Sequence, residues 1–340
     1  MKQEENQDLP LISVLMLAYN VECFIGTSIQ SILDQSFEDF ELIIYNDGST
    51  DGTSSVIRQY SDPRIRFYDH VQNKGLTYAR QATLAAAQGK YVAILDSDDI
   101  SMADRLEKQF RFLEKHPNVA ICGGNALLIN EAGEANGTLL HGSYDTEELK
   151  VRFFFNNIFV NSSVMYRRLL ALEVGGYRER APAEDYDLFV RLADKHDIYT
   201  FNEPLVYYRI HAENVSQAKR DVAIECLRQI KDEQLSLLGV DPRKYGPRFD
   251  ALLWWKLGEY TTADFLELLA ELKSANRISG KLPVAVFEKE LYNRWYELVM
   301  NTVPKKKAAA WLTKKELFER SLLNFQQKRR IFKLWLRSLF

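Results

Sequence analysis

Short apolar runs alternate with stretches of helical periodicity along the first hundred residues of the chain. Runs rich in β-branched and aromatic residues predict strands at residues 11–18, 40–45, 65–68 and 91–95. Helical spacing of the apolar positions predicts helices at residues 22–35, 51–60 and 76–88. Because the order strand, helix, strand is repeated three times, we expect a mainly parallel sheet with helices packed on its faces.

The pattern becomes less regular after residue 100. We expect a helix at residues 101–116, a strand at 160–166, a helix at 184–196 and a final strand at 205–210. The sequence around Gly123 and Gly124 predicts no regular element. Everything past about residue 216 is helical in pattern and shows no repeat. The chain is therefore predicted to hold an α/β domain at residues 1–216 and a helical region at residues 217–340.

Three of the predicted strands end in polar residues. Asn20 follows the first strand, Asp47 the second, and Asp96-Ser-Asp-Asp99 the fourth. Ligands of such sheets bind beyond the carboxyl ends of the strands, so we expect these side chains to line one crevice. Burying three carboxylates costs free energy unless a cation neutralises them, and Mg²⁺ and Mn²⁺ prefer oxygen ligands. The alternative for the carboxylates alone is a solvated acidic turn that closes the strand.

Residues 46–53 combine turn formers with two candidate helix N-caps, Ser49 and Asp51. An ordinary β-turn explains the two glycines and the cap, but it does not require Asp47 at the tip of the strand. The chain contains neither the phosphate-binding pattern G-x-x-x-x-G-K-[ST] nor the dinucleotide pattern G-x-G-x-x-G. A nucleotide site in this chain would therefore be of another kind.

The composition is that of a folded globular protein, with 340 residues of which 46% are hydrophobic. Cys23, Cys122 and Cys226 share no short spacing, so neither a zinc site nor a disulfide framework is indicated. This cysteine usage fits a reducing, cytoplasmic compartment. The first ten residues are polar, and no run of about 18 apolar residues occurs. We therefore expect neither a membrane span nor an export signal.

Charge is distributed unevenly along the chain. Residues 305–340 carry eleven Lys and Arg against two Glu, which gives this tail +9, whereas the whole chain carries −3 and the rest therefore −12. Trp, Leu and Phe alternate with the cations in roughly helical register, which is typical of a helix at an anionic lipid surface. A helix that packs its apolar side on the body explains the pattern equally well. Nucleic acid is the weakest interpretation, because the body is acidic and no recognised binding motif appears.

Several short motifs follow one another in a fixed order between residue 11 and about residue 216. They are Ser13-Val-Leu-Met-Leu-Ala-Tyr-Asn20, Asn46-Asp-Gly-Ser-Thr-Asp51, Asn73-Lys-Gly-Leu with Ala79-Arg80, Leu95-Asp-Ser-Asp-Asp99, Asp104-Arg-Leu with Gln109, Ala183-Glu-Asp-Tyr-Asp-Leu188, and Tyr208-Arg-Ile-His211. Each motif alone is a weak match, but the ordered series resembles the family-2 glycosyltransferases. These inverting enzymes have the GT-A fold and transfer a sugar from a nucleotide diphosphate.

The resemblance implies a role in donor binding for several of these residues. Asp47 would accept the imino N–H of the base, which favours a UDP-sugar, and Ala18 and Tyr19 would border the base. Asp96 would meet the ribose hydroxyls. Asn20, Asn73, Arg80 and Ser97 are implied in nucleotide binding in the same way.

The resemblance also implies a metal site. Asp98 would coordinate the Mn²⁺ or Mg²⁺ that bridges the diphosphate, and His211 matches a position that in some members completes the metal shell. The metal would act as a Lewis acid for the leaving group. A histidine at the end of a strand is otherwise most often a surface or packing residue.

The second set of carboxylates, Glu184, Asp185 and Asp187, begins a predicted helix, where the helix dipole alone favours acidic residues. The resemblance makes Asp185 the general base that takes the proton of the acceptor hydroxyl. It places Glu184 and Asp99 beside the sugar or acceptor. In-line attack from the face opposite the diphosphate would invert the anomeric carbon.

The class of acceptor is predicted from two features that the sequence lacks, the Q-x-x-R-W signature of processive synthases and spanning helices. We therefore expect transfer of a single sugar to a glycan or lipid-linked acceptor, in the cytoplasm or at the inner face of the plasma membrane. One alternative is a catalytically inactive scaffold that retains the fold. A sugar-nucleotide pyrophosphorylase is disfavoured, because the loop after the first strand has no basic residue and no glycine before Gly26.

Overall fold

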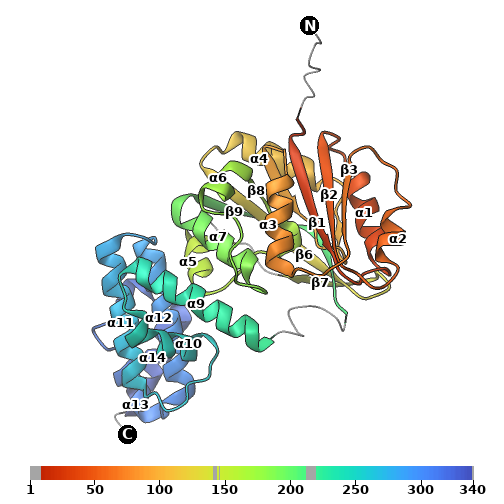
Figure 1. Cartoon of the computed structure of the whole chain (residues 1–340). Helices are drawn as coiled ribbons and strands as arrows, with labels where there is room; N and C mark the ends of the chain where they lie inside the picture. Colours follow the sequence, from red (N-terminus) through yellow and green to blue (C-terminus); the bar gives the residue numbers. More distant parts are fainter. Residues whose placement is uncertain (1–8, 141–143, 145, 212–219, 339–340) are drawn as a thin grey trace. The chain divides into compact units, whose positions relative to one another are not determined.

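The computed structural model describes residues 9–140, 144, 146–211 and 220–338 (Figure 1). The chain divides into two compact units, the first formed by Met1–Leu149 and Asn157–Cys226 and the second by Lys150–Asn156 and Leu227–Phe340. The boundary expected at residue 216 lies outside the described residues. The second unit also takes residues 150–156 from the middle of the chain, which the sequence pattern did not indicate.

A mixed sheet of nine strands forms the centre of the first unit. Its strands are β1 (Ile12–Ala18), β2 (Phe40–Asp47), β3 (Ile65–His70), β4 (Tyr91–Ile94), β5 (Ile100–Ser101), β6 (Val119–Ile129), β7 (Ala135–Leu140), β8 (Met165–Arg167) and β9 (Asp197–Arg209). The spatial order is β3-β2-β1-β4-β8-β6-β9-β5, with β7 paired to β6. The four strands predicted in the first hundred residues are confirmed, and the parallel pairs β1/β2, β1/β4 and β2/β3 join them.

The other five strands complete the sheet through both antiparallel and parallel pairs. Strand β8 pairs antiparallel with both β4 and β6, whereas β6 and β9 are parallel. Because β8 runs against β4, the residues that precede β8 lie beside the carboxyl end of β4. This arrangement brings the segment around Asn161 to the three aspartates that follow β4.

Both faces of the sheet's centre are covered, since every residue of β2 and β4 is buried. The helices of this unit are α1 (Ile25–Leu33), α2 (Thr53–Ile57), α3 (Leu76–Ala86), α4 (Arg105–Lys115), α6 (Arg168–Glu173) and α7 (Glu184–Lys195), and α5 (Thr146–Phe155) begins in it. Three apolar residues of α1, Ile25, Ile29 and Ile32, lie one turn apart and are fully buried in the core.

Two predictions about the first unit were wrong. The sequence around Gly123 and Gly124, expected to be irregular, forms the long strand β6. A Cβ on Gly123 would lie 2.6 Å from the ring of Phe159, and one on Gly124 would lie 2.6 Å from Leu205, so close packing requires both glycines. Of the strand expected at residues 160–166, only the end is extended, since Asn161–Ser163 form a 3-10 turn before β8.

The second unit is helical, as expected. It contains the end of α5, most of α9 (Arg220–Leu238), and α10 (Pro242–Leu253), α11 (Thr262–Ser279), α12 (Val284–Thr302), α13 (Lys305–Leu312) and α14 (Phe325–Ser338). Its core is centred on large side chains that are fully buried, among them Phe249, Phe265, Phe287 and Trp295. A capping box between Thr261 and Asp264 begins α11, and Gly280 ends it with φ of 61°.

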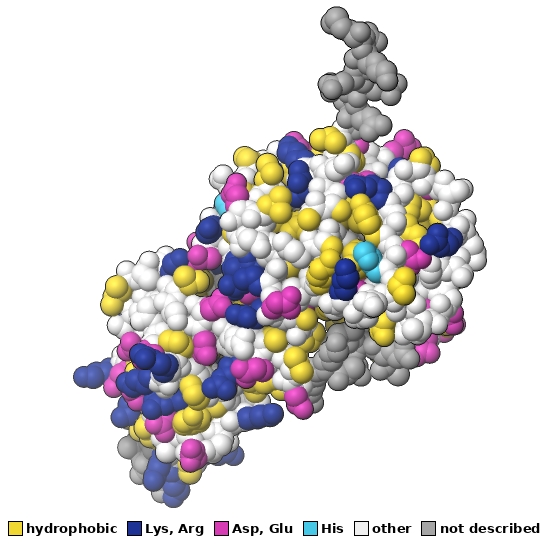
Figure 2. All heavy atoms as spheres, viewed as in Figure 1, with side chains coloured by type: hydrophobic (Ala, Val, Ile, Leu, Met, Phe, Trp, Pro, Cys, Tyr) yellow, Lys and Arg dark blue, Asp and Glu magenta, His cyan; other side chains and the backbone are white. Residues whose placement is uncertain are grey.

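The basic tail is part of this second unit. Ala308, Leu312 and Leu334 are buried in its core, so the interpretation that the tail packs its apolar side on folded protein is confirmed. In Figure 2, Lys and Arg side chains stand on the surface of this unit with hydrophobic side chains between them. Within the described residues, every helix is too short or too polar to span a bilayer.

Candidate active site

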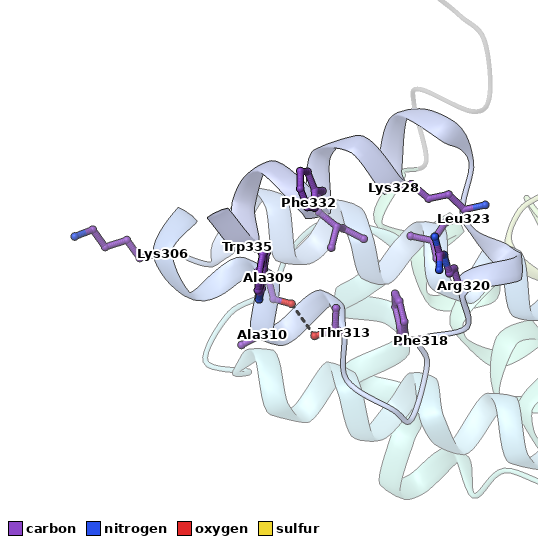
Figure 3. Close-up of a pocket in the computed structure, with 11 residues that line it drawn as sticks. Lys306, Ala309, Ala310, Thr313, Phe318, Arg320, Leu323, Lys328, Phe332 and Trp335 are labelled. Atoms are coloured by element: carbon purple, nitrogen blue, oxygen red, sulfur yellow. Dashed lines mark hydrogen bonds between the residues drawn. The ribbon is translucent and has the colours of Figure 1, made fainter. Parts of the chain in front are cut away.

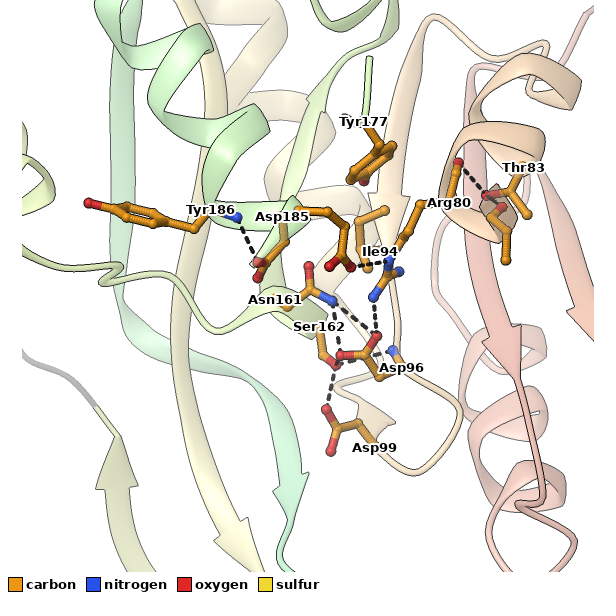
Figure 4. A network of polar contacts seen from close by, with 12 residues as sticks. Arg80, Thr83, Ile94, Asp96, Asp99, Asn161, Ser162, Tyr177, Asp185 and Tyr186 are labelled. Atoms are coloured by element: carbon orange, nitrogen blue, oxygen red, sulfur yellow. Dashed lines mark hydrogen bonds and ion pairs between the residues drawn. The ribbon is translucent and has the colours of Figure 1, made fainter. Parts of the chain in front are cut away.

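The carboxyl end of β4 carries Asp96, which is held by three side chains (Figure 4). The Arg80 guanidinium donates to Asp96 Oδ1 over 2.8 Å, and the Asn161 amide donates to both carboxylate oxygens over 3.0 and 2.9 Å. The Ser162 hydroxyl oxygen lies 3.1 Å from Oδ2. Burial would raise the pKa of Asp96, but Arg80 and these donors lower it below the ordinary value. Asp96 is therefore a fixed, ionised carboxylate.

Arg80 connects the two sets of carboxylates that the sequence places far apart. It is 4% exposed and comes from α3, and its Nε lies 3.6 Å from Glu184 Oε1 at the start of α7. Its pKa is raised by Asp96, Tyr177 and Glu184 in spite of its burial. Among the residues that the structure describes, its Nε and Nη1 have no hydrogen-bond partner, nor has Glu184 Oε2, although all three are buried. These groups retain hydrogen-bonding capacity for a ligand.

The two aspartates after Asp96, Asp98 and Asp99, contact different partners. Asp98 Oδ2 lies 2.8 Å from His211 Nε2, and the His211 ring packs 4.9 Å from that of Phe24. Asp99 is buried and accepts a hydrogen bond from Ser162 Oγ and one from the Arg209 backbone N–H over 2.8 Å. The Arg209 side chain donates to the Asp98 carbonyl over 2.7 Å, which fixes the turn between the two aspartates.

The electrostatics of this turn favour a cation. Burial and the neighbouring carboxylates raise the pKa of Asp98, and the same causes raise the pKa of Asp99 well above its usual range. A divalent ion at Asp98 would relieve this repulsion. Asp98 and His211 supply one oxygen and one nitrogen donor that would fit such an ion. Across residues 9–140, 144, 146–211 and 220–338 the side chains form no cluster of three or more His, Cys, Asp or Glu suited to a metal.

Glu184 and Asp185 begin α7, and Glu184 lies beside Arg80. Burial, assisted by Asp185, raises the pKa of Glu184 to about 7, and burial raises the pKa of Asp185 to about 6. Asp185 is the more exposed of the two and accepts a hydrogen bond from the Tyr186 backbone N–H over 2.6 Å. Carboxylates with pKa values near neutrality are suited to proton transfer.

Asp187, the third acidic residue at the start of α7, is held in ion pairs with two arginines. It is 1% exposed and pairs with Arg178 and Arg191, and these arginines lower its pKa although burial opposes them. The Arg191 side chain also donates to the Gly176 carbonyl, so the three side chains join α7 to the turn before it. These ion pairs distinguish Asp187, whose pKa is lowered, from Glu184 and Asp185, whose pKa values are raised.

Asp47 ends β2, two strands away from β4 and so about 10 Å to the side. Its Oδ1 accepts from the Lys74 backbone N–H over 2.8 Å and its Oδ2 from that of Gly75 over 2.9 Å. Asn73, in the same loop, is exposed and accepts from Gly75 N–H. Asp47 therefore organises the loop that begins α3. Among the described contacts, none joins Asp47 directly to Asp96 or Asp185.

The residues at the end of β1 lie next to this loop system. Ala18 is buried, whereas Tyr19 is 51% exposed. Asn20 adopts a left-handed conformation with φ of 52°, and its side-chain oxygen accepts from the Thr50 backbone N–H over 2.8 Å. Asn20 thereby ties the loop after β1 to the loop after β2.

Ser97 and two residues of helix α4 form buried hydrogen bonds next to the end of β4. Ser97 is buried, and its carbonyl accepts a hydrogen bond from Ser28 of α1 over 2.8 Å. Arg105 is fully buried and donates to the carbonyls of Ile94 and Val164, and Gln109 donates to the Ser163 carbonyl. These residues hold the end of β4 against the start of β8.

Sequence reasoning missed Asn161, Ser162 and Arg209 as members of the site. The sequence predicts a strand over Asn161 and Ser162, and only the polar Asn-Ser-Ser run that interrupts the apolar residues indicates a turn. Arg209 belongs to the Tyr208-Arg-Ile-His211 motif, which does not single it out. All three reach Asp96, Asp98 or Asp99 through pairings of distant strands that local patterns do not reveal.

Comparison with known proteins identifies the class to which this geometry belongs. Residues 13–174 match the model of the glycosyl transferase family 2. An uncharacterized glycosyltransferase of Methanocaldococcus jannaschii is 32% identical over 208 residues, which cover 60% of this chain and 72% of that protein.

Solved structures resemble the chain over nearly its whole length. The mannosyltransferase PcManGT of Pyrobaculum calidifontis, in complex with GDP-Man and Mn²⁺, aligns with a TM-score of 0.55 at 18% identity, covering 98% of this chain and 88% of that one. Residues 1–349 of S. aureus TarS, in complex with UDP-GlcNAc, align with a TM-score of 0.56 at 16% identity. The alignment covers 96% of this chain and 92% of that one. The fold is thus GT-A, as the sequence motifs implied. The chain belongs to the family-2 glycosyltransferases and is an enzyme of that class.

Proposed function

We propose that the first unit transfers one sugar from a nucleotide diphosphate to an acceptor hydroxyl, with inversion at the anomeric carbon. The observation that carries this proposal is the position of Arg80, which lies in contact with both Asp96 and Glu184. It brings the strand-end carboxylates and the helix-start carboxylates, about ninety positions apart in the sequence, to one guanidinium. Donor-binding and proton-accepting groups are thereby held in a single site.

Asp98 and His211 are proposed to hold the metal, Mn²⁺ or Mg²⁺, with the diphosphate. Burial and the charge of Asp96 raise the pKa of Asp98, which supports this assignment because a bound cation would offset both effects. The metal would neutralise charge on the leaving diphosphate. The Mn²⁺ in the PcManGT complex is in keeping with this proposal.

Asp185 is proposed to be the general base. Its carboxylate takes the proton of the acceptor hydroxyl as that oxygen forms a bond to the anomeric carbon. The bond from the anomeric carbon to the phosphate oxygen breaks, and the nucleoside diphosphate leaves with the electron pair. Glu184, buried beside Arg80, is the sequence neighbour of this base, and burial raises the pKa of both carboxyls toward neutrality. Asp99 orients the same region through Ser162.

UDP-sugars are the proposed donors. Asp47 retains acceptor capacity for the base, because a carboxylate has about four lone-pair sites and the loop after β3 uses two of them. Ala18, Tyr19, Asn20 and Asn73 border the same region. Asp96 and Ser97 would lie toward the ribose. The UDP-GlcNAc bound in TarS supports a uridine donor, and a glycan or lipid-linked acceptor at the inner face of the plasma membrane completes the proposal.

Donor hydrolysis tests the assignment without knowledge of the acceptor. The purified chain is incubated with a panel of UDP- and GDP-sugars with and without Mn²⁺, and the released nucleotide is quantified. We expect Mn²⁺-dependent release from one UDP-sugar, lost in Asp98→Ala and retained in Glu173→Gln, a control at an exposed acidic residue of α6. Release that is independent of metal and unchanged in Asp98→Ala would refute the proposal.

A further inference from the structure

The second unit contains a cavity of about 380 Å³ between α13, α14 and the segment that joins them (Figure 3). Its lining is mostly apolar, with Ala309 and Ala310 from α13, Phe318 and Leu323 from the connection, and Phe332 and Trp335 from α14 among the lining residues. A volume of this size lies within the range of small-molecule sites. Nothing in the proposed glycosyl transfer uses this cavity.

Three basic side chains are among the residues that line the cavity. Lys306, Arg320 and Lys328 line it together with the apolar residues, and the lining contains no carboxylate. All three are exposed, and over the side chains that the structure describes none of them pairs with Asp or Glu. Glu319, the nearest acidic residue in the sequence, is engaged by Lys273 and Arg277 instead. The cavity therefore combines an apolar interior with an uncompensated positive rim.

Helix α14 carries apolar side chains on its exposed side as well as on the side that packs against the core. With 3.6 residues per turn, Gln327, Ile331 and Leu334 share the side that faces the core. Phe325 and Phe332 lie on the opposite side and are 78% and 59% exposed, and Leu336 lies there too. Trp335, half-exposed, stands between the two sides and stacks on Phe332 with ring centroids 6.2 Å apart. The outward side of α14 is thus apolar and aromatic.

The charges next to this outward side are positive. Arg329 and Lys333 flank the exposed phenylalanines on α14, and both are exposed. Aromatic residues beside lysine and arginine are the composition of surfaces that rest at the boundary between lipid headgroups and acyl chains. Cations this close to an anionic bilayer are attracted to its surface.

We propose that the α13–α14 face is a docking site for an anionic phospholipid bilayer. Phe325, Phe332 and Trp335 enter the headgroup boundary, the cavity receives one acyl chain, and Lys306, Arg320 and Lys328 contact phosphate groups. The charge complementarity and the apolar cavity select lipid over a second copy of the chain, whose equivalent face would carry the same positive charge. This inference rests on the second unit alone and is independent of sugar transfer.

Binding of the full chain to vesicles tests the inference. Co-sedimentation is measured with phosphatidylcholine vesicles and with vesicles that also contain phosphatidylglycerol, at low and high salt. We expect binding to the anionic vesicles alone, weakened by salt, and weakened at least about ten-fold by Phe332→Ser combined with Trp335→Ser, since each aromatic side chain loses its burial. Ile278→Ser, at an 86% exposed apolar residue of α11, is the matched control and should bind as the wild type.

Fluorescence locates the contact. Phospholipids with brominated acyl chains should quench the wild-type tryptophan emission, and Trp335→Phe should remove most of that quenching while retaining binding. Arg320→Gln combined with Lys328→Gln should weaken binding without disturbing the aromatic face, which separates lost charge from misfolding. Inorganic phosphate at matched ionic strength should not displace the chain, because the bilayer and not the free anion is the ligand.

Three results would overturn the inference. One is binding of the Phe332→Ser and Trp335→Ser variant equal to that of the wild type. Another is absence of binding to anionic vesicles. The third is a concentration-dependent dimer in light scattering that the same two substitutions dissociate, which would make this face a protein interface.

Discussion

The guanidinium of Arg80, from helix α3, donates a hydrogen bond from Nη2 to Oδ1 of Asp96, which follows strand β4, over 2.8 Å. The same guanidinium lies 3.6 Å from Glu184. A buried arginine between two carboxylates fixes their separation as well as their charge. The geometry of the proposed site therefore depends on this one side chain.

Replacing Arg80 by lysine tests that dependence. A single ammonium cannot reach Asp96 and Glu184 together, so we expect Arg80→Lys to lower kcat/KM for transfer or donor hydrolysis by at least about ten-fold and to lower the unfolding midpoint. Steady-state kinetics and thermal unfolding measure the two effects. Arg58→Lys is the control, because that arginine forms an exposed pair with Asp69. Unchanged kinetics in Arg80→Lys would show that a positive charge suffices.

Asp185→Asn tests the general base. The amide keeps the size and the hydrogen bond to the Tyr186 backbone N–H but cannot take a proton. We expect kcat to fall by at least about 10²-fold while the dissociation constant of the donor is nearly unchanged. Single-turnover kinetics and calorimetric titration separate the two quantities. A variant that keeps its rate of transfer would assign the proton to another group.

The pH dependence follows from the raised pKa values of the same pair. Asp185 accepts a proton only when ionised, so transfer should slow as the pH falls through about 6. Glu184 has an ordinary pKa of 4.5 that burial raises to about 7, so between these values the folded chain binds more protons than the unfolded chain. The free energy of unfolding should therefore decrease as the pH rises through this window.

Glu184→Gln should remove the contribution of Glu184 to that stability decrease. We expect the variant to unfold at a temperature close to that of the wild type at pH 5 and at a higher temperature at pH 8, with no donor or metal added. Scanning calorimetry at the two pH values makes the comparison. A variant that is less stable than the wild type at pH 8 would mean that ionised Glu184 stabilises the fold through Arg80.

Asp187 should matter for stability and not for chemistry. It is buried between Arg178 and Arg191, so Asp187→Asn leaves two cations with a neutral partner and should cost about 3 kcal/mol of unfolding free energy. Asp62→Asn breaks a more exposed pair with Arg64 and should cost about 1 kcal/mol or less. Denaturant unfolding measures both. Equal losses would contradict the structural role given to Asp187.

Local patterns in the sequence predicted the first half of the sheet well, because β1, β2 and β4 are continuous apolar runs bounded by turn residues. They failed at β6, where Gly123 and Gly124 look like a turn. Those glycines serve the approach of Phe159 and Leu205, which are distant in the sequence. Close packing between remote segments leaves no periodic signal.

The same limit applies to the site. The strand-end aspartates could be found from the sequence, since charges after a buried run are conspicuous. The contact of Asn161 with Asp96 depends on the antiparallel pairing of β4 and β8, which no local pattern indicates. The tail shows the opposite case: its apolar period predicted a helix, but only the structure distinguishes the buried Leu334 from the exposed Phe332.

Donor binding measured by thermal unfolding tests the central claim most directly, because a ligand that binds only the folded chain raises its unfolding temperature. The full chain, Asp98→Ala and Asp185→Asn are each heated with a UDP-sugar and Mn²⁺. We predict that the midpoint rises in the wild type and in Asp185→Asn, does not rise in Asp98→Ala, and does not rise when Mn²⁺ is omitted. An equal rise in Asp98→Ala, or no rise with any UDP-sugar in the wild type, would contradict a metal-dependent donor site at the end of β4.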